Sequence, residues 1–202
     1  MQPEDGKKTM RIGVLALQGA FREHCKILRR LGVEVVEVRL PEELENLDGL
    51  IIPGGESTTI GKLADWYGLM EPLKEAAKSI PVWGTCAGLV FMAKEVGMQQ
   101  PILAVMDMTV ERNAFGRQVD SFEEDLEMEG LEGGSFHGVF IRAPVITKVG
   151  TEIQVLSRLK DGRIVAARRG SLMVTAFHPE LSSDDRIHRY FLRMCEQASV
   201  QG

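Results

Sequence analysis

Cysteines and long apolar runs are scarce in this chain of 202 residues. Its three cysteines, Cys25, Cys86 and Cys195, are odd in number and widely spaced and form no CxxC pair, which excludes a zinc ribbon and argues against a disulfide framework. No metal site is expected, because no group of histidines, cysteines and carboxylates has ligand spacing. No apolar run approaches the roughly 20 residues that a membrane-spanning helix needs. We therefore expect a soluble protein of a reducing cytoplasm, with no membrane partner.

Basic residues are also fewer than acidic ones. The chain has 24 lysines and arginines and 29 aspartates and glutamates, which gives a formal net charge of -5. A negative field does not attract nucleic acid, so no nucleic-acid partner is expected. Residues 1–9 are polar and lack the apolar core of a signal peptide, and we expect them to form a disordered extension. Residues 10–202 suffice for a single domain, because no linker or repeat divides them.

Apolar runs and amphipathic segments alternate through the first half of the chain. The pattern predicts strands at residues 11–17, 33–38, 50–52 and 80–83, and helices at residues 20–31, 58–67, 72–78 and 89–96. This alternation predicts an α/β fold with a doubly wound, mostly parallel central sheet and flanking helices. In such sheets functional groups gather beyond the carboxyl ends of the strands.

The second half is richer in strand-like runs. They cover residues 105–110, 138–142, 153–159, 163–168 and 172–177 and predict additional antiparallel strands, with a hairpin turn at residues 160–162. Residues 184–198 form an amphipathic helical pattern. The acidic run at residues 123–132 is interpreted as solvated surface, and His137 as a loop residue that enters a strand.

The pentapeptide Gly84-Thr85-Cys86-Ala87-Gly88 follows an apolar run and is typical of a sharp strand-to-helix turn. Such a turn lifts the side chain of Cys86 out of the sheet, and a thiol at a helix N-terminus is favoured as the thiolate. The Ala87 N–H would lie beside it as an oxyanion donor. Cys86 is therefore predicted to be a nucleophile.

The tetrapeptide Phe177-His178-Pro179-Glu180 ends another predicted strand. A thiol nucleophile needs an imidazole to move its proton, and that imidazole needs an acceptor on its second nitrogen. His178 and Glu180 fit these two roles. A triad of Cys86, His178 and Glu180 follows.

The other cysteines and histidines have simpler interpretations. Cys25 and Cys195 lie on apolar helix faces and are interpreted as buried packing groups. His24 and His188 lie on helices and are interpreted as ordinary packing or surface groups.

The glycine-rich segment at residues 53–59 is not a nucleotide-binding loop. Five residues rather than four separate Gly55 from Gly61, and Leu63 stands where a serine or threonine should bind magnesium. We interpret the segment as backbone N–H groups offered to an oxyanion, next to side chains that hold a substrate. A glycine turn before a capped helix is compatible with this interpretation.

These motifs together resemble one family, the triad-type (class I) glutamine amidotransferases, and within it the glutaminase subunit of pyridoxal 5'-phosphate synthase. The resemblance extends from Met10 to the last helix. It is carried by Cys86, by His178-Pro179-Glu180, and by the segments at residues 17–24, 53–59, 110–113, 115–122 and 138–144.

The resemblance implies a role for each matching residue. Cys86 becomes the nucleophile, His178 the acid and base, and Glu180 its orienting group. L-Glutamine would contact Gly55, Glu56, Ser57, Arg112, Ile141 and Arg142. The loops at Gln18, Gly19 and Gly54 would shape the oxyanion site and meet a synthase subunit in a large hetero-oligomer. No cofactor is implied.

Three alternatives remain open at this stage. A glutaminase subunit of another pathway would share the triad but lack the segment at residues 115–122. A stand-alone cysteine hydrolase would need neither glutamine nor a partner. A regulatory binding module on the same scaffold would not need the intact triad.

Overall fold

A buried parallel sheet forms the centre of the computed structural model, which describes residues 9–115 and 121–201. Five parallel neighbours lie in the order β2-β1-β3-β4-β12. Their bounds are β1 (Arg11–Leu15), β2 (Glu34–Val38), β3 (Gly49–Ile52), β4 (Val82–Thr85) and β12 (Leu172–Thr175). Every residue of β3, β4 and β12 is buried, as expected for parallel strands covered on both faces.

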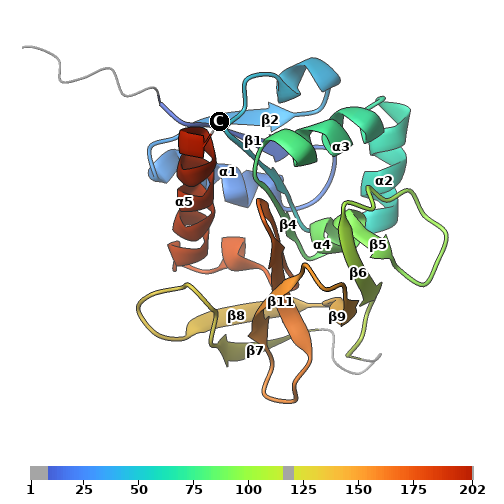
Figure 1. Ribbon diagram of the computed structural model, residues 1–202, viewed down its shortest axis with the longest axis vertical. Coiled ribbons are helices and arrows are strands. Elements are labelled where there is room, and N and C mark those ends of the chain that lie inside the picture. Colours follow the sequence, from blue (N-terminus) through green and yellow to red (C-terminus); the bar gives the residue numbers. More distant parts are fainter. Residues whose placement is uncertain (1–8, 116–120, 202) are drawn as a thin grey trace, which may run out of the picture.

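Helices cover both faces of these parallel strands. They are α1 (Phe21–Arg30), α2 (Ser57–Trp66), α3 (Met70–Ser79), α4 (Ala87–Met92) and α5 (Arg186–Gln201), with short 3-10 helices η1 (Pro41–Leu44) and η2 (Pro179–Leu181). Helices α1 and α5 lie on one face, and α2, α3 and α4 lie on the other (Figure 1). The predicted doubly wound α/β fold is confirmed. None of the described helices is both long enough and apolar enough to cross a bilayer.

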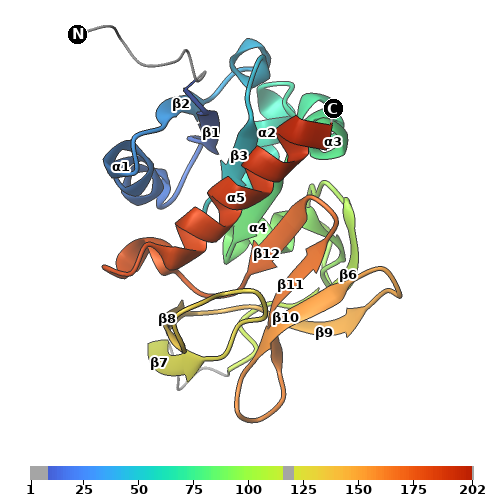
Figure 2. The same ribbon diagram turned by 60° about the vertical axis from the view of Figure 1, so that its left-hand side comes forward.

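The sheet continues beyond β12 as mostly antiparallel strands. The order is β12-β11-β9-β6-β5, with β10 paired to β11, so that the described residues place ten strands in one sheet. The bounds are β5 (Ala93–Glu95), β6 (Met106–Glu111), β9 (Val145–Val149), β10 (Gln154–Arg158) and β11 (Ile164–Arg169). Strands β7 (Ser121–Leu126) and β8 (Phe136–Ile141) form a separate antiparallel pair at the lower end of Figure 2.

Some sequence expectations were wrong. The helix expected at residues 89–96 begins at Ala87 and ends at Met92, because Ala93 turns to an extended backbone and pairs with Met106 at the start of β5. Part of the acidic run forms the unexpected strand β7, in which Phe122 stacks on Phe140, but Glu123 and Asp125 are exposed as the solvated-surface interpretation predicted. His137 lies inside β8 rather than in a loop. The extension expected at residues 1–9 lies outside the described residues except for Thr9.

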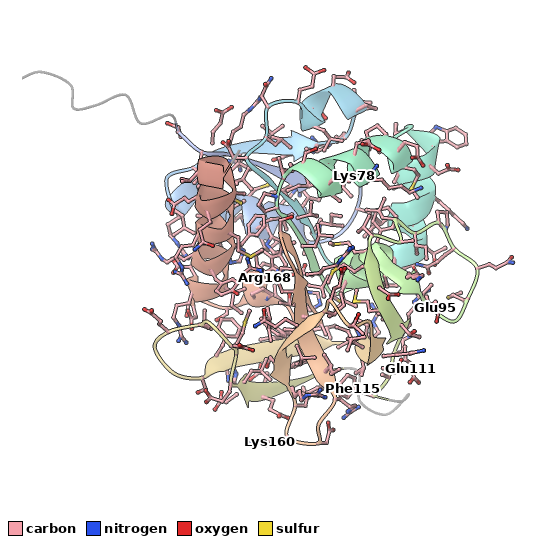
Figure 3. All side chains as sticks on the ribbon, viewed as in Figure 1. Lys78, Glu95, Glu111, Phe115, Lys160 and Arg168 are labelled. Atoms are coloured by element: carbon pink, nitrogen blue, oxygen red, sulfur yellow. The ribbon has the colours of Figure 1, made fainter. Side chains whose placement is uncertain are left out.

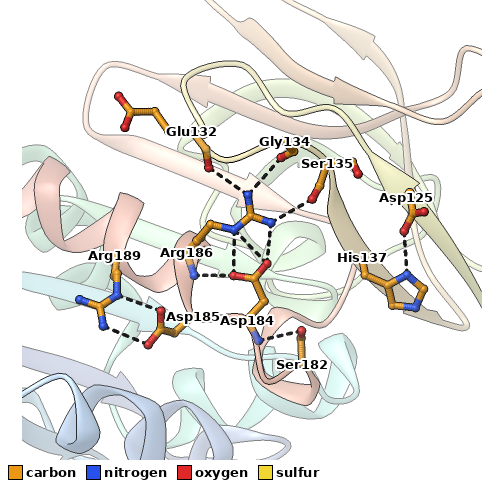
Figure 4. A network of polar contacts seen from close by, with 10 residues as sticks. All are labelled: Asp125, Glu132, Gly134, Ser135, His137, Ser182, Asp184, Asp185, Arg186 and Arg189. Carbon is orange, nitrogen blue, oxygen red and sulfur yellow. Dashed lines mark hydrogen bonds and ion pairs between the residues drawn. The ribbon is translucent and has the colours of Figure 1, made fainter.

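Arg186, in the first turn of α5, fixes the long loop between β7 and β8. Its guanidinium donates to the carbonyl oxygens of Glu132, Gly134 and Ser135 at 2.9–3.1 Å, and it pairs with Asp184 at 2.6 Å (Figure 4). Only the short link at residues 182–185 separates η2 from the start of α5. The contacts of Arg186 therefore also restrain the segment that carries His178 and Glu180.

Candidate active site

Cys86 occupies a strained turn between β4 and α4. Its backbone angles are φ 48° and ψ -102°, in a region that residues with a side chain rarely adopt. The turn brings α4 so close to β3 that a Cβ on Gly88 would lie 2.0 Å from the carbonyl oxygen of Ile52. Only glycine fits there. The strand-to-helix turn expected from the pentapeptide is present, with Cys86 at its apex.

His178 and Glu180 form a buried hydrogen-bonded pair just after β12. The Nδ1 atom of His178 lies 2.7 Å from Oε1 of Glu180, and the Glu180 side chain is 0% exposed. Pro179 begins the tight turn η2, which brings two residues so close in sequence into contact.

Burial by itself would lower the pKa of His178, but its hydrogen bonds with Cys86 and Glu180 outweigh burial and raise that pKa to about 10. A protonated imidazole between a thiolate and a carboxylate is the arrangement that a cysteine nucleophile needs. The three residues predicted from the sequence to form a triad therefore lie together in one cavity, with His178 bonded to Glu180.

Gly54 lies against both reacting side chains. A Cβ on Gly54 would be 2.7 Å from Cε1 of His178 and 3.3 Å from Cβ of Cys86. The Gly54 carbonyl accepts a hydrogen bond from the Ala20 N–H at 2.9 Å, and a Cβ on Gly19 would come within 1.9 Å of that oxygen. Two loops from separate strand ends therefore meet tightly beside Cys86.

Gln18 adds a second link between these loops. Its Oε1 atom accepts a hydrogen bond from the Glu56 N–H at 2.8 Å and covers Gly55. A shift of the Gln18 loop must therefore also move the backbone of Gly54 and Gly55.

A cavity of about 800 Å³ opens above Cys86, and nearly all predicted site residues line it. The cavity volume lies in the usual range for sites that bind small molecules. Gly19 does not line the cavity but packs behind it on Gly54. The predicted residues that line it are Gln18, Gly54, Gly55, Glu56, Ser57, Cys86, Ala87, Arg112, Ile141, Arg142, His178 and Glu180.

Several further lining residues were not predicted as site residues from the sequence. They are Ala20, Val90, Asn113, Pro144, Leu181 and Phe115, the last of which was noted only as part of the segment at residues 115–122. Phe115, labelled in Figure 3, packs at a tilt against Phe122 with ring centroids 4.6 Å apart and lies under the Arg163 guanidinium at 3.9 Å. Residues 116–120 of the segment that carries the family resemblance lie outside the described residues.

Glu56 caps helix α2. Its carboxylate accepts hydrogen bonds from the backbone of Thr58 and Thr59, from the Thr59 hydroxyl, and from Arg112 at 3.0 Å. Burial raises the pKa of Glu56, but hydrogen bonds to Thr59 and Thr58 outweigh it and lower that pKa to about 2. These four donors match the roughly four acceptor sites of a carboxylate. The Glu56 side chain therefore brings a fixed charge to the cavity and shapes its backbone.

Arg112 is held by neighbours that the sequence did not reveal. Its Nη1 atom donates to Oε1 of Gln100 at 2.9 Å and to the Thr58 hydroxyl at 3.2 Å. Gln100 in turn donates to the Ser57 hydroxyl at 3.3 Å. Gln100 lies in an irregular connection after β5, where no periodic pattern could have marked it.

Residues at the end of β8 complete the rim of the cavity. The carbonyl oxygen of Ile141 lies 3.9 Å from Sγ of Cys86, and Arg142 follows with a positive φ of 43°. The exposed Arg142 side chain is therefore turned out of the strand pattern at the cavity edge.

For His24 and His188 the sequence left two roles open, packing group or surface group. Both are 0% exposed, so neither is a surface group. His24 lies within 3.5 Å of Oε2 of Glu180, behind the triad.

Comparison with known proteins adds independent information. Residues 14–197 match the family described as the SNO glutamine amidotransferase family. A pyridoxal 5'-phosphate synthase subunit PdxT from Dehalococcoides mccartyi is 58% identical over 191 residues, which cover 93% of this chain and 98% of that protein. The PdxT protein from Roseiflexus castenholzii is 54% identical over 189 residues, covering 92% of this chain and 100% of that protein.

Solved structures agree with these relatives. A crystal structure of a glutamine amidotransferase superposes with a TM-score of 0.87 at 56% identity and covers 92% of this chain and 98% of its own. A putative GMP synthase protein from Thermoplasma acidophilum superposes with a TM-score of 0.73 at 18% identity, covering 97% of this chain and 99% of its own. At that identity the second likeness shows the fold alone.

Proposed function

This chain belongs to the SNO glutamine amidotransferase family, and we propose that Cys86, His178 and Glu180 carry out its glutaminase reaction. The chain is the glutaminase subunit of pyridoxal 5'-phosphate synthase; its substrate is L-glutamine and its partner is the synthase subunit. The observation that carries the proposed mechanism is the His178–Glu180 hydrogen bond of 2.7 Å, formed between side chains that line the same cavity as Cys86.

In the first step the Cys86 thiolate attacks the side-chain amide carbon of glutamine. A C–S bond forms, and the carbonyl oxygen becomes an oxyanion held by the Ala87 N–H and a backbone N–H near Gly55. His178 gives its proton to the leaving nitrogen, so ammonia departs and a glutamyl thioester remains on Cys86.

In the second step water hydrolyses the thioester. Neutral His178 takes a proton from water, the resulting hydroxide attacks the thioester carbon, and glutamate leaves as the thiolate of Cys86 is restored. Throughout, Glu180 holds the proton on Nδ1 of His178, so that Nε2 is the atom that exchanges protons.

Glutamine binding is assigned to the cavity above Cys86. Gly55, Ser57, Ile141 and Arg142 all line this cavity. Glu56 and Arg112 pair with each other at 3.0 Å in the cavity wall and bring one charge of each sign to it. This pairing of opposite charges favours a zwitterionic substrate.

Partner docking is assigned to the loop of Gln18 and Gly19. Because these residues pack directly on Gly54 and bond to Glu56, a synthase subunit that presses on the loop would set the oxyanion site. The ammonia then passes to the partner rather than to water, where protonation would remove its nucleophilicity.

The compartment proposed for this reaction is the cytoplasm. All three cysteines, Cys25, Cys86 and Cys195, are free and buried, which suits a reducing environment. We also infer that residues 10–202 act as one domain, because strands from both halves of the chain share one sheet.

The test is glutamate release from glutamine, measured with and without the synthase subunit. The wild-type chain is expected to release glutamate at full rate only with that partner. Cys86→Ala is expected to bind the partner and release none. Persistent glutamate release by Cys86→Ala would refute the assignment of the nucleophile.

A further inference from the structure

Two histidines are buried directly behind the triad, and the mechanism above does not use them. His24 on α1 and His188 on α5 are joined by a contact of 2.9 Å between Nδ1 of His24 and Nε2 of His188. The Nε2 atom of His24 lies 3.5 Å from Oε2 of Glu180 and 3.4 Å from the Thr85 hydroxyl. The Trp83 ring packs edge-on against both imidazoles, with centroids 5.5 and 5.0 Å away.

Both imidazoles are neutral at neutral pH. Burial, and then the nearby His188 and His178, lower the pKa of His24 well below its usual value. Burial lowers the pKa of His188 to about 4, against the smaller opposing effect of Asp185 and with a minor contribution from Arg30. Each ring therefore carries one N–H, and its position decides what the ring can do.

The Glu180 carboxylate determines that position, because the Thr85 hydroxyl beside Nε2 of His24 can either donate or accept and so favours neither tautomer. Among the described residues, Oε2 of Glu180 and Nδ1 of His188 are the buried side-chain atoms without a hydrogen-bond partner. A lone pair on Nε2 of His24 would face the carboxylate oxygen and repel it, whereas an N–H there is attracted to it. The proton of His24 therefore belongs on Nε2.

The protonation of the other ring nitrogens of His24 and His188 follows from this first proton. Nδ1 of His24 must then accept, so Nε2 of His188 donates to it across 2.9 Å, and Nδ1 of His188 is left as a bare acceptor. The opposite arrangement would bury an unpaired N–H on His188 and also point a lone pair at Glu180. It is disfavoured at both ends.

Resting on the proposed function, we propose that His24 is a positioning residue for the glutaminase triad. Its Nε2–H holds the second oxygen of Glu180, while the first oxygen receives the Nδ1–H of His178. His188 fixes the tautomer of His24. Because His24 is neutral, it orients the carboxylate without cancelling the charge that stabilises protonated His178.

This role explains why a tight turn alone is insufficient. Pro179 restrains the backbone of η2, but a backbone turn does not by itself fix the side-chain torsions of Glu180. Helix α1 packs against η2, so a donor on α1 can hold the carboxylate from behind. Glu180 is then fixed at both oxygens between two imidazoles.

The first test is the tautomer of each histidine, read from the ring nitrogen resonances of the full-length chain by NMR at neutral pH. We expect His24 and His188 to carry their protons on Nε2 and to leave Nδ1 unprotonated. A proton on Nδ1 of His24, or a charged His24 ring, would overturn the proposal. This measurement does not depend on glutaminase activity.

The second test is kinetic and uses the complex with the synthase subunit. His24→Leu removes the donor and should lower kcat by about 10- to 100-fold, the usual cost of a hydrogen bond to a charged group, with the KM for glutamine unchanged. His24→Gln places an N–H near the position of Nε2 and should recover most of that loss. Cys25→Ala is the matched control, because it alters the next residue of α1, also buried, and should keep wild-type kcat.

The kinetic results decide whether His24 positions Glu180. Wild-type kcat in His24→Leu, or a loss in His24→Gln as large as that in His24→Leu, would contradict the positioning role. An equal loss in Cys25→Ala would show that only the packing of α1 was measured. If the wild-type complex released no glutamate, the proposed function would fail instead, and the tautomers would still be readable.

Discussion

Replacing Glu180 by glutamine removes one negative charge with almost no change in volume. In the native chain Oε1 of Glu180 accepts from Nδ1 of His178 at 2.7 Å, and Oε2 lies 3.5 Å from Nε2 of His24. A glutamine amide can satisfy only one of these two neighbours. If its oxygen faces His178, its NH2 group lies against the N–H of His24, so that two donors face each other without an acceptor. If its NH2 group faces His178, the ring must move its proton to Nε2 and can no longer accept one from Cys86.

The expected loss of activity in Glu180→Gln follows from the negative charge that the substitution removes. An opposite charge at this separation typically shifts a pKa by about 1 to 3 units, so the pKa of His178 should fall by that amount from its present value of about 10. That shift corresponds to roughly 1 to 4 kcal/mol less stabilisation of the protonated ring. In serine-protease triads the comparable loss of tautomer control lowers kcat about 10⁴-fold. We expect kcat of Glu180→Gln to fall by about 10²- to 10⁴-fold, with KM little changed.

The assay is glutamate release by the complex with the synthase subunit, together with an NMR titration of His178. Glu123→Gln is the control, because Glu123 also contacts a histidine, His137 at 2.9 Å, but on the exposed surface of β7. It should keep wild-type kcat. Wild-type kcat in Glu180→Gln, or an unchanged pKa of His178, would refute the assignment of Glu180.

Three further predictions concern stability and loop coupling. The pKa of His188 is about 4 in the folded chain against 6.5 when unfolded, so its neutral burial favours folding above pH 6.5. That contribution, about 3 kcal/mol, is lost as pH falls from 6.5 to 4, and His188→Phe should flatten this part of the pH dependence in urea unfolding. Gly88→Ala places a Cβ 2.0 Å from a backbone oxygen, so overpacking should lower the free energy of unfolding by about 1–3 kcal/mol and reduce both the Tm and glutamate release; an unchanged Tm would contradict the packing of α4. Gln18→Ala leaves the Glu56 N–H without its acceptor and should reduce partner-dependent glutamate release about 2- to 10-fold; full activity would contradict the coupling of the two loops.

Local chemistry made much of the site predictable. Cys86 lies within a pentapeptide whose small residues permit a positive φ, and Glu180 follows His178 by two residues, so short-range sequence was sufficient to bring these groups into consideration. The alternation of strands and helices predicted the parallel sheet, because its strands are buried on both faces.

Contacts between distant segments could not be predicted in the same way. His24 and His188 are 164 positions apart and meet only because α1 and α5 cover the same face of the sheet. Strand β7 was not predicted because its acidic residues, among them Glu123 and Asp125, hide the alternating pattern of a strand. Phe122 packs on the other face of that strand. Glu56 was assigned to the substrate, yet its position directly before Ser57 could have suggested the N-cap that it forms.

The nucleophilic role of Cys86 is tested most directly by trapping the covalent intermediate. The complex with the synthase subunit would be mixed with glutamine, quenched in acid during turnover, digested, and examined by mass spectrometry. We predict a glutamyl group in thioester linkage on the peptide that contains Cys86, and none in Cys86→Ser. A wild-type complex that releases glutamate with no adduct on Cys86, while Cys86→Ser retains full activity, would contradict this role.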